Sequence, residues 1–470
     1  LYALEATDFH HENLIAAGEH PILIDQEAFF HPRIEGTDLP AEERLGMQAM
    51  NFSVLRVGLL PLQILLNEEL EGIDISGIGG HEGQQTPWPV PQWQDNDTDQ
   101  MRLIRKKSTM IGTNNRPTLN STDIDPLAYR EDLLRGFTQM YRLLMVQREA
   151  LLAGPLEKFA HDEIRLILRP TQMYAELLFE GSHPDVLRDA LNRDRFFDHL
   201  WALIEHCPYL ARAIPYERRD LHMGDVPIFL TTPSTRDVFT SHGEILTDFL
   251  AEPSFISAQQ RVQNLDGPDL QRQIWLIEAS LATLEMGNPH AARKFSALEP
   301  TDTKASGEQL LTAACTVGDR ISELALRNAE HVSWLGLSLV NERRWALLPV
   351  GLDLYDGIYG IILFLSYLGA VSHKEDYTVL ARQAFYSYTK QLEQAKKTLK
   401  RIGAFDGWSA RIYLLTHLGS LWHEPTLWNE AEELVDLLPE LIPQDQKKDI
   451  ISGAAGCLLV LLSLYQVRPT

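Results

Sequence analysis

The chain has 470 residues, 44% of them hydrophobic, and its 42 lysines and arginines against 65 aspartates and glutamates give a formal net charge of −23. This length and apolar content predict a globular protein of two or three domains. The acidic excess argues against nucleic acid or an anionic membrane as the main partner.

Cysteine content and hydropathy indicate the compartment. The three cysteines show no C-x-x-C spacing, which favours a reducing cytoplasmic location over a disulfide framework. No apolar run reaches the length of a membrane span, and no signal peptide opens the chain. LYALEATDF opens in mid-element and GCLLVLLSLYQVRPT closes just past an apolar helix, so we expect a fragment of a longer protein.

The first elements follow from local patterns. The apolar runs NLIAA (13–17) and PILID (21–25), separated by three residues, predict a tight hairpin. A helix is predicted over roughly 41–70, followed by a glycine-rich loop, GIDISGIGG (72–80). The polar, proline-broken segment 81–99 predicts a long surface excursion.

The predicted elements that follow are a mostly helical region over 125–210 broken by a short run at 164–169, a proline-punctuated strand region over 224–239, and a helical region over 255–296. A polar break at 298–309 then predicts a domain boundary. We therefore expect a first domain over 1–300 and a second over 310–470.

The second domain is predicted to be a ring of helical hairpins. Three segments share a glycine-bearing turn followed at once by an apolar helix: LYDGIYGIILFLSYLG (354–369), FDGWSARIYLLTHLG (405–419) and ISGAAGCLLVLLSLY (451–465). Their glycines, Gly357, Gly407 and Gly453, are 50 and then 46 residues apart, which leaves room for two helices in each repeat. Small residues would let the helix starts crowd together at one end.

The opening hairpin carries a pattern typical of phosphoryl transfer. Asp8 precedes Asn13 by five residues, and Asp25 follows the hairpin 17 residues after Asp8. Kinases use one aspartate to orient and deprotonate a hydroxyl, and an asparagine and a second aspartate to hold magnesium. Asp and Asn also cap turns and helices widely, so the residues alone leave a structural role open.

A second pattern indicates phosphate binding. Arg165 and Arg169 are four residues apart, so they would share a face in either a strand or a helix. Two arginines on one face make a good phosphate clamp. The alternative is a pair of surface salt bridges.

These segments, taken in order, resemble one family. TDFHHEN, IAAGEHPILIDQEAFFHP, SVLRVGLLP, DISGIGG, RLILRPTQMY and GDVPIF resemble the dehydratase domain of class II lanthipeptide synthetases of the LanM type. LYDGIYGI and ISGAAGCLLVLLSLY resemble the start of the family's LanC-like cyclase domain. The resemblance implies an α+β, lipid-kinase-like and largely helical dehydratase lobe, followed by an incomplete α/α-toroid.

The resemblance also implies an activity. The dehydratase would use ATP and Mg²⁺ to phosphorylate Ser and Thr of a ribosomally made precursor peptide, which has a leader and a Ser/Thr/Cys-rich core. It would then eliminate the phosphate, leaving dehydroalanine or dehydrobutyrine. The cyclase would add cysteine thiols to these alkenes and form thioether rings.

Five residues match the family's phosphorylation site. The resemblance makes Asp8 the catalytic acid near the substrate hydroxyl, and His10 the support of its loop. Asn13 and Asp25 would hold magnesium, and Glu27 matches a further acid of the site.

For the elimination step, the resemblance assigns Arg165 and Thr171, with Arg169 as the second half of the arginine clamp. Two departures from the family pattern bear on this assignment and on the cyclase. Val57 stands where a hydroxyl residue is frequent, so an elimination contact is in doubt. Ser409 stands where glycine is usual, which puts the tight packing of that turn in doubt.

Parts of both sites are expected outside this chain. A kinase needs an upstream lysine and a lobe over the nucleotide, yet only seven residues precede Asp8. The cyclase Zn²⁺ ligands of the family would lie beyond residue 470, so we expect no zinc ligand in this chain and read Cys457 as core packing. We expect the isolated chain to be inactive.

Two other functions remain open. A small-molecule or lipid-kinase-like phosphotransferase would leave the phosphate on its substrate. A non-catalytic peptide-binding scaffold would use the acidic residues only to cap loops.

Overall fold

The computed structural model describes residues 1–33, 41–64, 73–80, 83–86, 89–109, 117–119, 122–202, 204–205, 207–287, 304–340, 344–388 and 399–469. The chain divides into two compact units, which are described separately. Unit 1 comprises Leu1–Asp38, Met50–Ala291 and Leu339–Ala346, and unit 2 comprises Leu39–Ala49, Ala292–Ser338 and Leu347–Thr470. Of the predicted boundary at 298–309, residues 298–303 lie outside the described residues.

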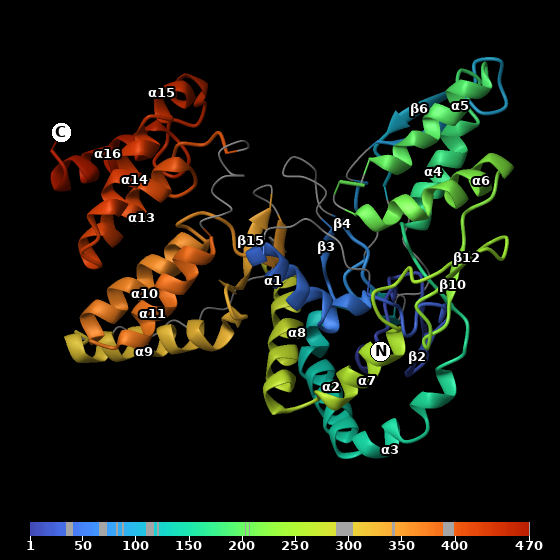
Figure 1. Ribbon diagram of the computed structural model, residues 1–470, viewed down its shortest axis with the longest axis horizontal. Helices are drawn as coiled ribbons and strands as arrows, with labels where there is room; N and C mark the ends of the chain where they lie inside the picture. The colour runs from blue at the N-terminus through green and yellow to red at the C-terminus, as the bar shows by residue number, and fades with distance from the viewer. Residues whose placement is uncertain are drawn as a thin grey trace. The chain divides into compact units, whose positions relative to one another are not determined.

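Unit 1 combines short strands with helices (Figure 1). Its strands are β1 (Leu14–Ala17), β2 (His20–Leu23), β3 (Gln63–Ile64), β4 (Ile73–Asp74), β5 (Val90–Gln94), β6 (Arg102–Lys106), β7 (Thr118–Leu119), β8 (Thr122–Asp123), β9 (Ile164–Arg165), β10 (Phe229–Thr231), β11 (Val238–Thr240) and β12 (Ile245–Leu246). Strands β12-β11-β10-β9, in that order, form an antiparallel sheet, and the others pair two by two.

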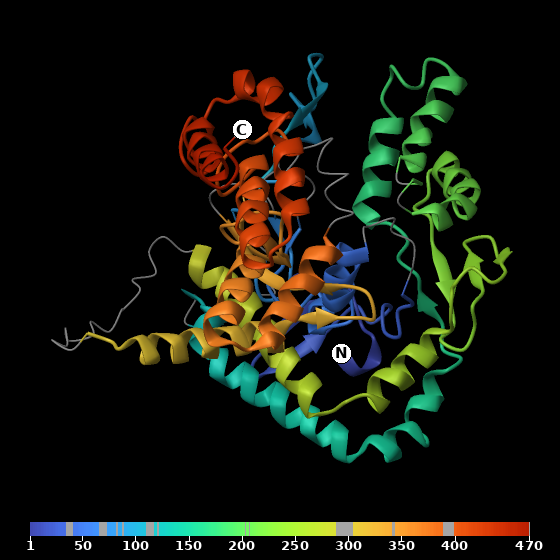
Figure 2. The same cartoon turned by 60° about the vertical axis from the view of Figure 1, so that its left-hand side comes forward.

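The helices of unit 1 are α2 (Arg130–Val146), α3 (Arg148–Leu152), α4 (Thr171–Gly181), α5 (Ala190–Phe196), α6 (Ile214–Met223), α7 (Ser254–Gln263) and α8 (Gly267–Gly287). Helix α2 lies alongside α8, and α4 packs against α5 and α6 (Figures 1 and 2). The apolar side chains form several separate clusters. One lies at the four-stranded sheet, around Phe229 and Val238, and another lies between α4 and α6, around Leu177 and Leu221.

The predicted opening hairpin is confirmed. Strands β1 and β2 pair antiparallel with Leu14 opposite Leu23 and Ala17 opposite His20. Only Gly18 and Glu19 form the turn, and Gly18 has a φ of +63°, which glycine adopts without steric cost.

The helix predicted over 41–70 is shorter in the structure. Helix α1 (Ala41–Asn51) ends early, and Ser53 caps a short 3-10 helix, η2 (Val54–Val57), by accepting a hydrogen bond from the Leu55 N–H at 3.1 Å. Gly58, with a φ of +81°, then turns the chain toward β3. The serine cap and the glycine override the apolar periodicity, and residues 65–70 lie outside the described part.

The surface excursion predicted over 81–99 contains a strand. Val90–Gln94 pairs with Arg102–Lys106 through five residue pairs, although β5 includes Pro91. Asp95 and Asp97, both with positive φ, form the connecting turn. The predicted surface position agrees with residues 89–99, which are half-buried or exposed, whereas the strand was not predicted, because its pairing depends on a partner strand that local composition does not indicate. Residues 81–82 and 87–88 lie outside the description.

Helices α2 to α5 agree with the mostly helical region predicted over 125–210, and α7 and α8 agree with the helical region predicted from 255. The strand region predicted over 224–239 holds β10 and the first part of β11. Three elements cross the division between the units: α1, β15 (Leu335–Val340) and β16 (Arg344–Pro349). None of the described helices combines the length and hydropathy that a bilayer crossing requires.

Unit 2 is nearly all helix. Its further elements are α9 (Gly307–Leu324), β13 (Leu326–Arg327), β14 (Val332–Ser333), α10 (Ile358–Ser372), α11 (Glu375–Ser387), α13 (Trp408–Leu421), α14 (Pro425–Val435), α15 (Leu438–Leu441) and α16 (Ala454–Val467). Helix α10 packs against α11, and α13 packs against α10, α14 and α16 (Figures 1 and 2).

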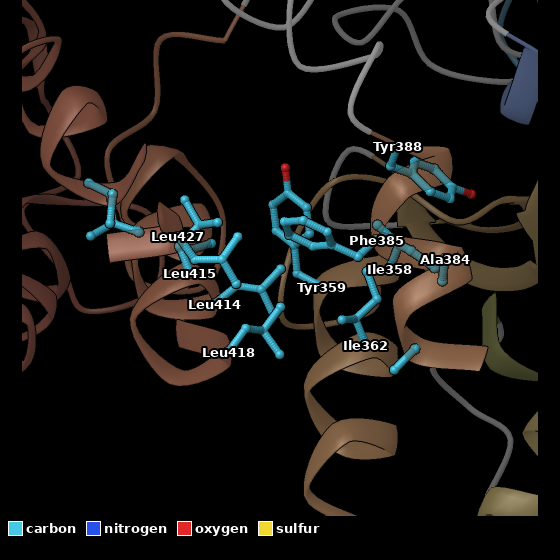
Figure 3. Close-up of a cluster of buried hydrophobic side chains, with 14 of the residues drawn as sticks. Ile358, Tyr359, Ile362, Ala384, Phe385, Tyr388, Leu414, Leu415, Leu418 and Leu427 are labelled. Carbon is cyan, nitrogen blue, oxygen red and sulfur yellow. The ribbon is translucent and has the colours of Figure 1, made fainter. Parts of the chain in front are cut away.

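The predicted repeat is confirmed at its helix starts. Helix α10 begins at the residue after Gly357, α13 at the residue after Gly407, and α16 at the residue after Gly453. Side chains from the hairpins meet in one core, where Tyr359 and Phe385 lie across from Leu414 and its neighbours (Figure 3). As predicted, Cys457 belongs to this core and is 2% exposed.

Ser409 is accommodated without opening its turn. The side chain is fully buried, and its hydroxyl donates a hydrogen bond to the Ile402 carbonyl oxygen at 2.6 Å. Gly407 carries the steric demand instead: its φ is +150°, and a Cβ there would lie 2.7 Å from the Arg401 carbonyl carbon.

Candidate functional site

The loop from Asp8 to Asn13 is closed by its own side chains. The Asn13 amide nitrogen donates to the Asp8 carbonyl oxygen at 2.9 Å and lies 3.3 Å from His10 Nε2. The same imidazole nitrogen lies 3.9 Å from Asp8 Oδ1. His10 therefore touches both ends of the loop, which fits the supporting role that the sequence resemblance implies.

Asp8 is presented to solvent by a strained backbone. Its φ is +68°, in the left-handed region that aspartate tolerates better than most residues. The next residue, Phe9, is fully buried, and its N–H donates to the Val57 carbonyl oxygen at 2.9 Å. The buried phenylalanine fixes the chain, while the side chain of Asp8 stays 41% exposed.

The hairpin brings Asn13 and Asp25 to the same end. Asn13 immediately precedes β1, and its carbonyl oxygen accepts a hydrogen bond from the Ile24 N–H at 3.2 Å. This bond extends the β1–β2 ladder by one residue pair, Asn13 with Ile24. Asp25 is the next residue after Ile24, so the backbone places it at the same end as Asn13. The predicted convergence at the open end of the hairpin is therefore present in the backbone.

Arg165 reaches this end from far along the chain. Its Nη1 donates to Glu27 Oε1 at 2.5 Å, and its backbone N–H donates to the Glu27 carbonyl oxygen at 3.0 Å. The side chains of Glu27 and Arg165 are 37% and 22% exposed. A residue predicted for elimination thus lies beside the residues predicted for phosphorylation.

Electrostatics indicate that these groups share one environment. Partial burial raises the pKa of the Asp8 carboxyl above its ordinary value, and the negative charges of Asp25 and Glu27 raise it further. The positive charges of His10 and Arg165 oppose the increase. An aspartate with a raised pKa is a better proton acceptor than an ordinary one.

The side chains at the hairpin end fit magnesium by their chemistry. Carboxylates of Asp8, Asp25 and Glu27 and the amide oxygen of Asn13 are the hard oxygen ligands that this ion prefers. The unfavourable effect of Asp25 and Glu27 on the charged form of Asp8 is one that a cation would relieve. Among the described residues, however, no three His, Cys, Asp or Glu side chains already converge as a metal site.

The predicted arginine clamp is not formed as expected. Strand β9 ends at Arg165 and helix α4 begins at Thr171, so the residues between have no regular face to share. Arg169 is 3% exposed, and its Nε donates to Glu217 Oε1 at 2.7 Å. Its Nη2 donates to the Leu200 carbonyl oxygen at 2.8 Å. Arg169 is therefore a buried structural cation, and the clamp prediction was wrong for it.

The remaining two residues singled out from the sequence, Thr171 and Val57, differ in exposure. Thr171 is exposed at the first position of α4. Val57, which stands where the family often has a hydroxyl residue, is 5% exposed, so its side chain packs in the core. Its carbonyl oxygen holds Phe9, and this contribution does not depend on the side chain.

His31 is a residue that the sequence reasoning missed. Burial, with the nearby charge of Arg56, lowers the pKa of His31 to about 3, so the ring is neutral. Its Nε2 accepts a hydrogen bond from the Ile167 N–H at 3.0 Å. His31 thereby ties the chain after Glu27 to the segment between Arg165 and Thr171. The histidine-proline pair in FFHP was the only local signal.

The glycine-rich loop after β4 supports the site and does not cradle phosphate. Its backbone N–H groups already donate to other groups of the protein. Those of Gly77 and Ile78 donate to the Gly58 and Leu59 carbonyl oxygens, and that of Gly79 donates to Ser76 Oγ. The Ile75 carbonyl oxygen lies 3.0 Å from His11 Nδ1 and accepts the His11 N–H at 3.1 Å. The glycine-rich loop therefore stabilises the Asp8–Asn13 loop through hydrogen bonds to His11.

Comparison with known proteins adds two family matches. Residues 1–232 match the family described as "Domain of unknown function (DUF4135)", and residues 349–470 match "Lanthionine synthetase C-like protein". The chain is also similar to the "Lacticin 481/lactococcin biosynthesis protein LcnDR2" of Lactococcus lactis subsp. lactis, with 23% identity over 484 residues. That alignment takes in 98% of this chain and 50% of the relative, so the chain spans about half the length of the curated relative.

Proposed function

Because the chain belongs to the class II lanthipeptide synthetases, we propose that unit 1 contributes to the dehydration of Ser and Thr in a precursor peptide during lantibiotic biosynthesis. The observation that carries this proposal is the meeting of Asp8, Asn13, Asp25 and Glu27 with Arg165. Groups suited to phosphoryl transfer and a group suited to phosphate departure lie at one end of one hairpin.

The first step is phosphorylation by a kinase-like lobe. Asp8 accepts the proton of the substrate hydroxyl, whose oxygen forms a bond to the γ-phosphorus of ATP as the bond from that phosphorus to ADP breaks. Asn13 and Asp25 would hold Mg²⁺, with Glu27 close by. The ion supplies charge neutralisation on the phosphates. His10 keeps the Asp8 loop in place.

The second step is elimination of phosphate. A base removes the α-proton, the electrons of the Cα–H bond form the Cα=Cβ bond, and phosphate leaves with the electrons of the Cβ–O bond. Arg165 binds the departing phosphate and stabilises its charge. Thr171, exposed at the start of α4, supplies a hydroxyl donor.

Unit 2 would take part in thioether formation. The match to lanthionine synthetase C-like proteins implies a helical toroid, and the hairpins α10–α11 and α13–α14 supply its pattern of paired helices. The described residues do not gather a set of His, Cys, Asp or Glu ligands for Zn²⁺. The zinc site of the cyclase and the cytoplasmic location remain predictions.

Intact-mass spectrometry of the precursor peptide tests the dehydratase. The protein, expressed from its complete reading frame, is produced together with the precursor peptide encoded beside it. We expect the loss of one water per modified residue, and retention of phosphate with Arg165→Ala. Arg188→Ala, which removes an exposed arginine paired with Asp185, should dehydrate normally.

Two other outcomes would contradict the proposal. Phosphate retained by the unsubstituted protein would favour a phosphotransferase acting without elimination. A peptide that binds but stays unmodified would favour a scaffold function.

A further inference from the structure

Glu27 and Arg165 are joined at two levels. The Arg165 N–H donates to the Glu27 carbonyl oxygen at 3.0 Å, so the two backbones stay adjacent whatever their side chains do. The side chains then meet at 2.5 Å, between Nη1 and Oε1. The residues are 138 positions apart in the chain, so tertiary folding alone creates the contact.

The carboxylate of Glu27 accepts a hydrogen bond from the Arg165 guanidinium, which is the group that a phosphate would need. A guanidinium binds carboxylate and phosphate oxygens with the same N–H groups. While Glu27 holds Nη1, a phosphate must compete with it for Arg165. Both side chains are partly exposed, so an anion from solvent can reach the pair.

Once it leaves Arg165, the Glu27 carboxylate has other groups to interact with, at the site of Asp8 and Asp25. It lies close enough to Asp8 to raise the pKa of that carboxyl, as does Asp25. A Glu27 side chain turned toward these acids would join the oxygen ligands suited to Mg²⁺. The backbone hydrogen bond involves neither side chain, so rotation of the Glu27 side chain does not break it.

We propose that Glu27 is an internal competitor that masks Arg165 until the phosphate of a phosphorylated residue displaces it. This inference rests on the proposed dehydratase function and adds an order to its two steps. Before phosphorylation, the Glu27 carboxylate balances the charge of Arg165, so the arginine does not bind other phosphates and draw them away from the positions that the reaction requires. After phosphorylation, the dianion outcompetes a single carboxylate, and Arg165 becomes available for elimination.

Phosphate binding without turnover tests the masking. Inorganic phosphate is titrated calorimetrically into the unsubstituted protein and into Glu27→Gln, with neither ATP nor Mg²⁺ present. We expect Glu27→Gln to bind phosphate about fivefold more tightly, the effect of losing one partly exposed ion pair. The matched control is Glu163→Gln, which removes the same charge from an exposed position two residues before Arg165. It should change the affinity by less than about twofold.

A double-mutant cycle identifies Arg165 as the group that is released. In an Arg165→Gln background, adding Glu27→Gln should give no further gain in phosphate affinity. A gain that persists without Arg165, or one equal to that of Glu163→Gln, would overturn the masking. Thermal unfolding of each variant shows whether it is folded, and Glu27→Asp, which keeps the charge on a shorter side chain, gives a second measure with an expected intermediate gain.

The two proposals fail in different ways. If the unsubstituted protein dehydrates the peptide but Glu27→Gln gains no affinity, the masking is wrong and the dehydratase stands. If Glu27→Gln gains affinity through Arg165 but the peptide is never dehydrated, the proposed function is wrong while the ion pair still competes with phosphate.

Discussion

Glu217 and Arg169 form a buried ion pair that joins α6 to the segment before α4, with 2.7 Å between Oε1 and Nε and with side chains that are 0% and 1% exposed. The Tyr174 hydroxyl donates to the same carboxylate oxygen at 2.6 Å. Three side chains therefore fix the segment that carries Arg165 at one end and Thr171 at the other. Removing one charge would leave the other buried and unpaired.

Arg169→Ala should lower the free energy of unfolding by about 3–5 kcal/mol, because Glu217 would lose its buried partner. Urea denaturation measures the change. Arg188→Ala, whose ion pair with Asp185 is exposed, should cost less than about 1 kcal/mol. A small effect of Arg169→Ala on stability, together with retained phosphate on the peptide, would restore Arg169 to the phosphate clamp.

Asp8 should titrate above the ordinary range of aspartate, because burial and the charges of Asp25 and Glu27 raise its pKa. As general base it must be deprotonated, so phosphorylation should fall as the pH drops through this raised pKa. Asp25→Asn removes a negative neighbour and should lower the pKa, whereas Arg165→Ala removes a positive one and should raise it. Carboxyl NMR titration without Mg²⁺ measures both shifts. A lower pKa in Arg165→Ala would contradict the assigned environment.

Ser409→Ala should destabilise unit 2 by about 1–2 kcal/mol, because the Ile402 carbonyl oxygen would lose its donor in a buried position. Ser420→Ala is the control: its hydroxyl also donates to a backbone carbonyl, at 3.3 Å, but the residue is exposed. It should leave stability nearly unchanged. Equal thermal shifts for the two variants would show that the Ser409 hydroxyl contributes nothing in this turn.

Gly407→Ala should also lower the free energy of unfolding, by about 1–3 kcal/mol, because alanine rarely adopts a φ of +150° and its Cβ would approach the Arg401 backbone. Gly307→Ala, at the start of α9 and facing open space, should be neutral or stabilise the protein slightly. Calorimetry of the two variants compares the positions directly. If Gly407→Ala melted like Gly307→Ala, the turn before α13 would not require glycine.

Sequence reasoning succeeded where the information is local. Two short apolar runs around Gly18 determine the first hairpin, and this hairpin alone carries Asn13 and Asp25 to one end. The glycines before α10, α13 and α16 mark helix starts for a similarly local reason, since a turn must come before each apolar helix. These features depend on backbone conformations that neighbouring residues impose.

Only the tertiary structure decided the partners of the charged side chains. The four-residue spacing of Arg165 and Arg169 is the same whether both bind phosphate or neither does. Folding placed Glu27 against the first and Glu217 against the second, one pair open to solvent and the other buried. A sequence determines which charges exist and how the chain turns locally. Which charge is masked, buried or left available depends on contacts between distant segments, whose energies exist only once the chain has folded.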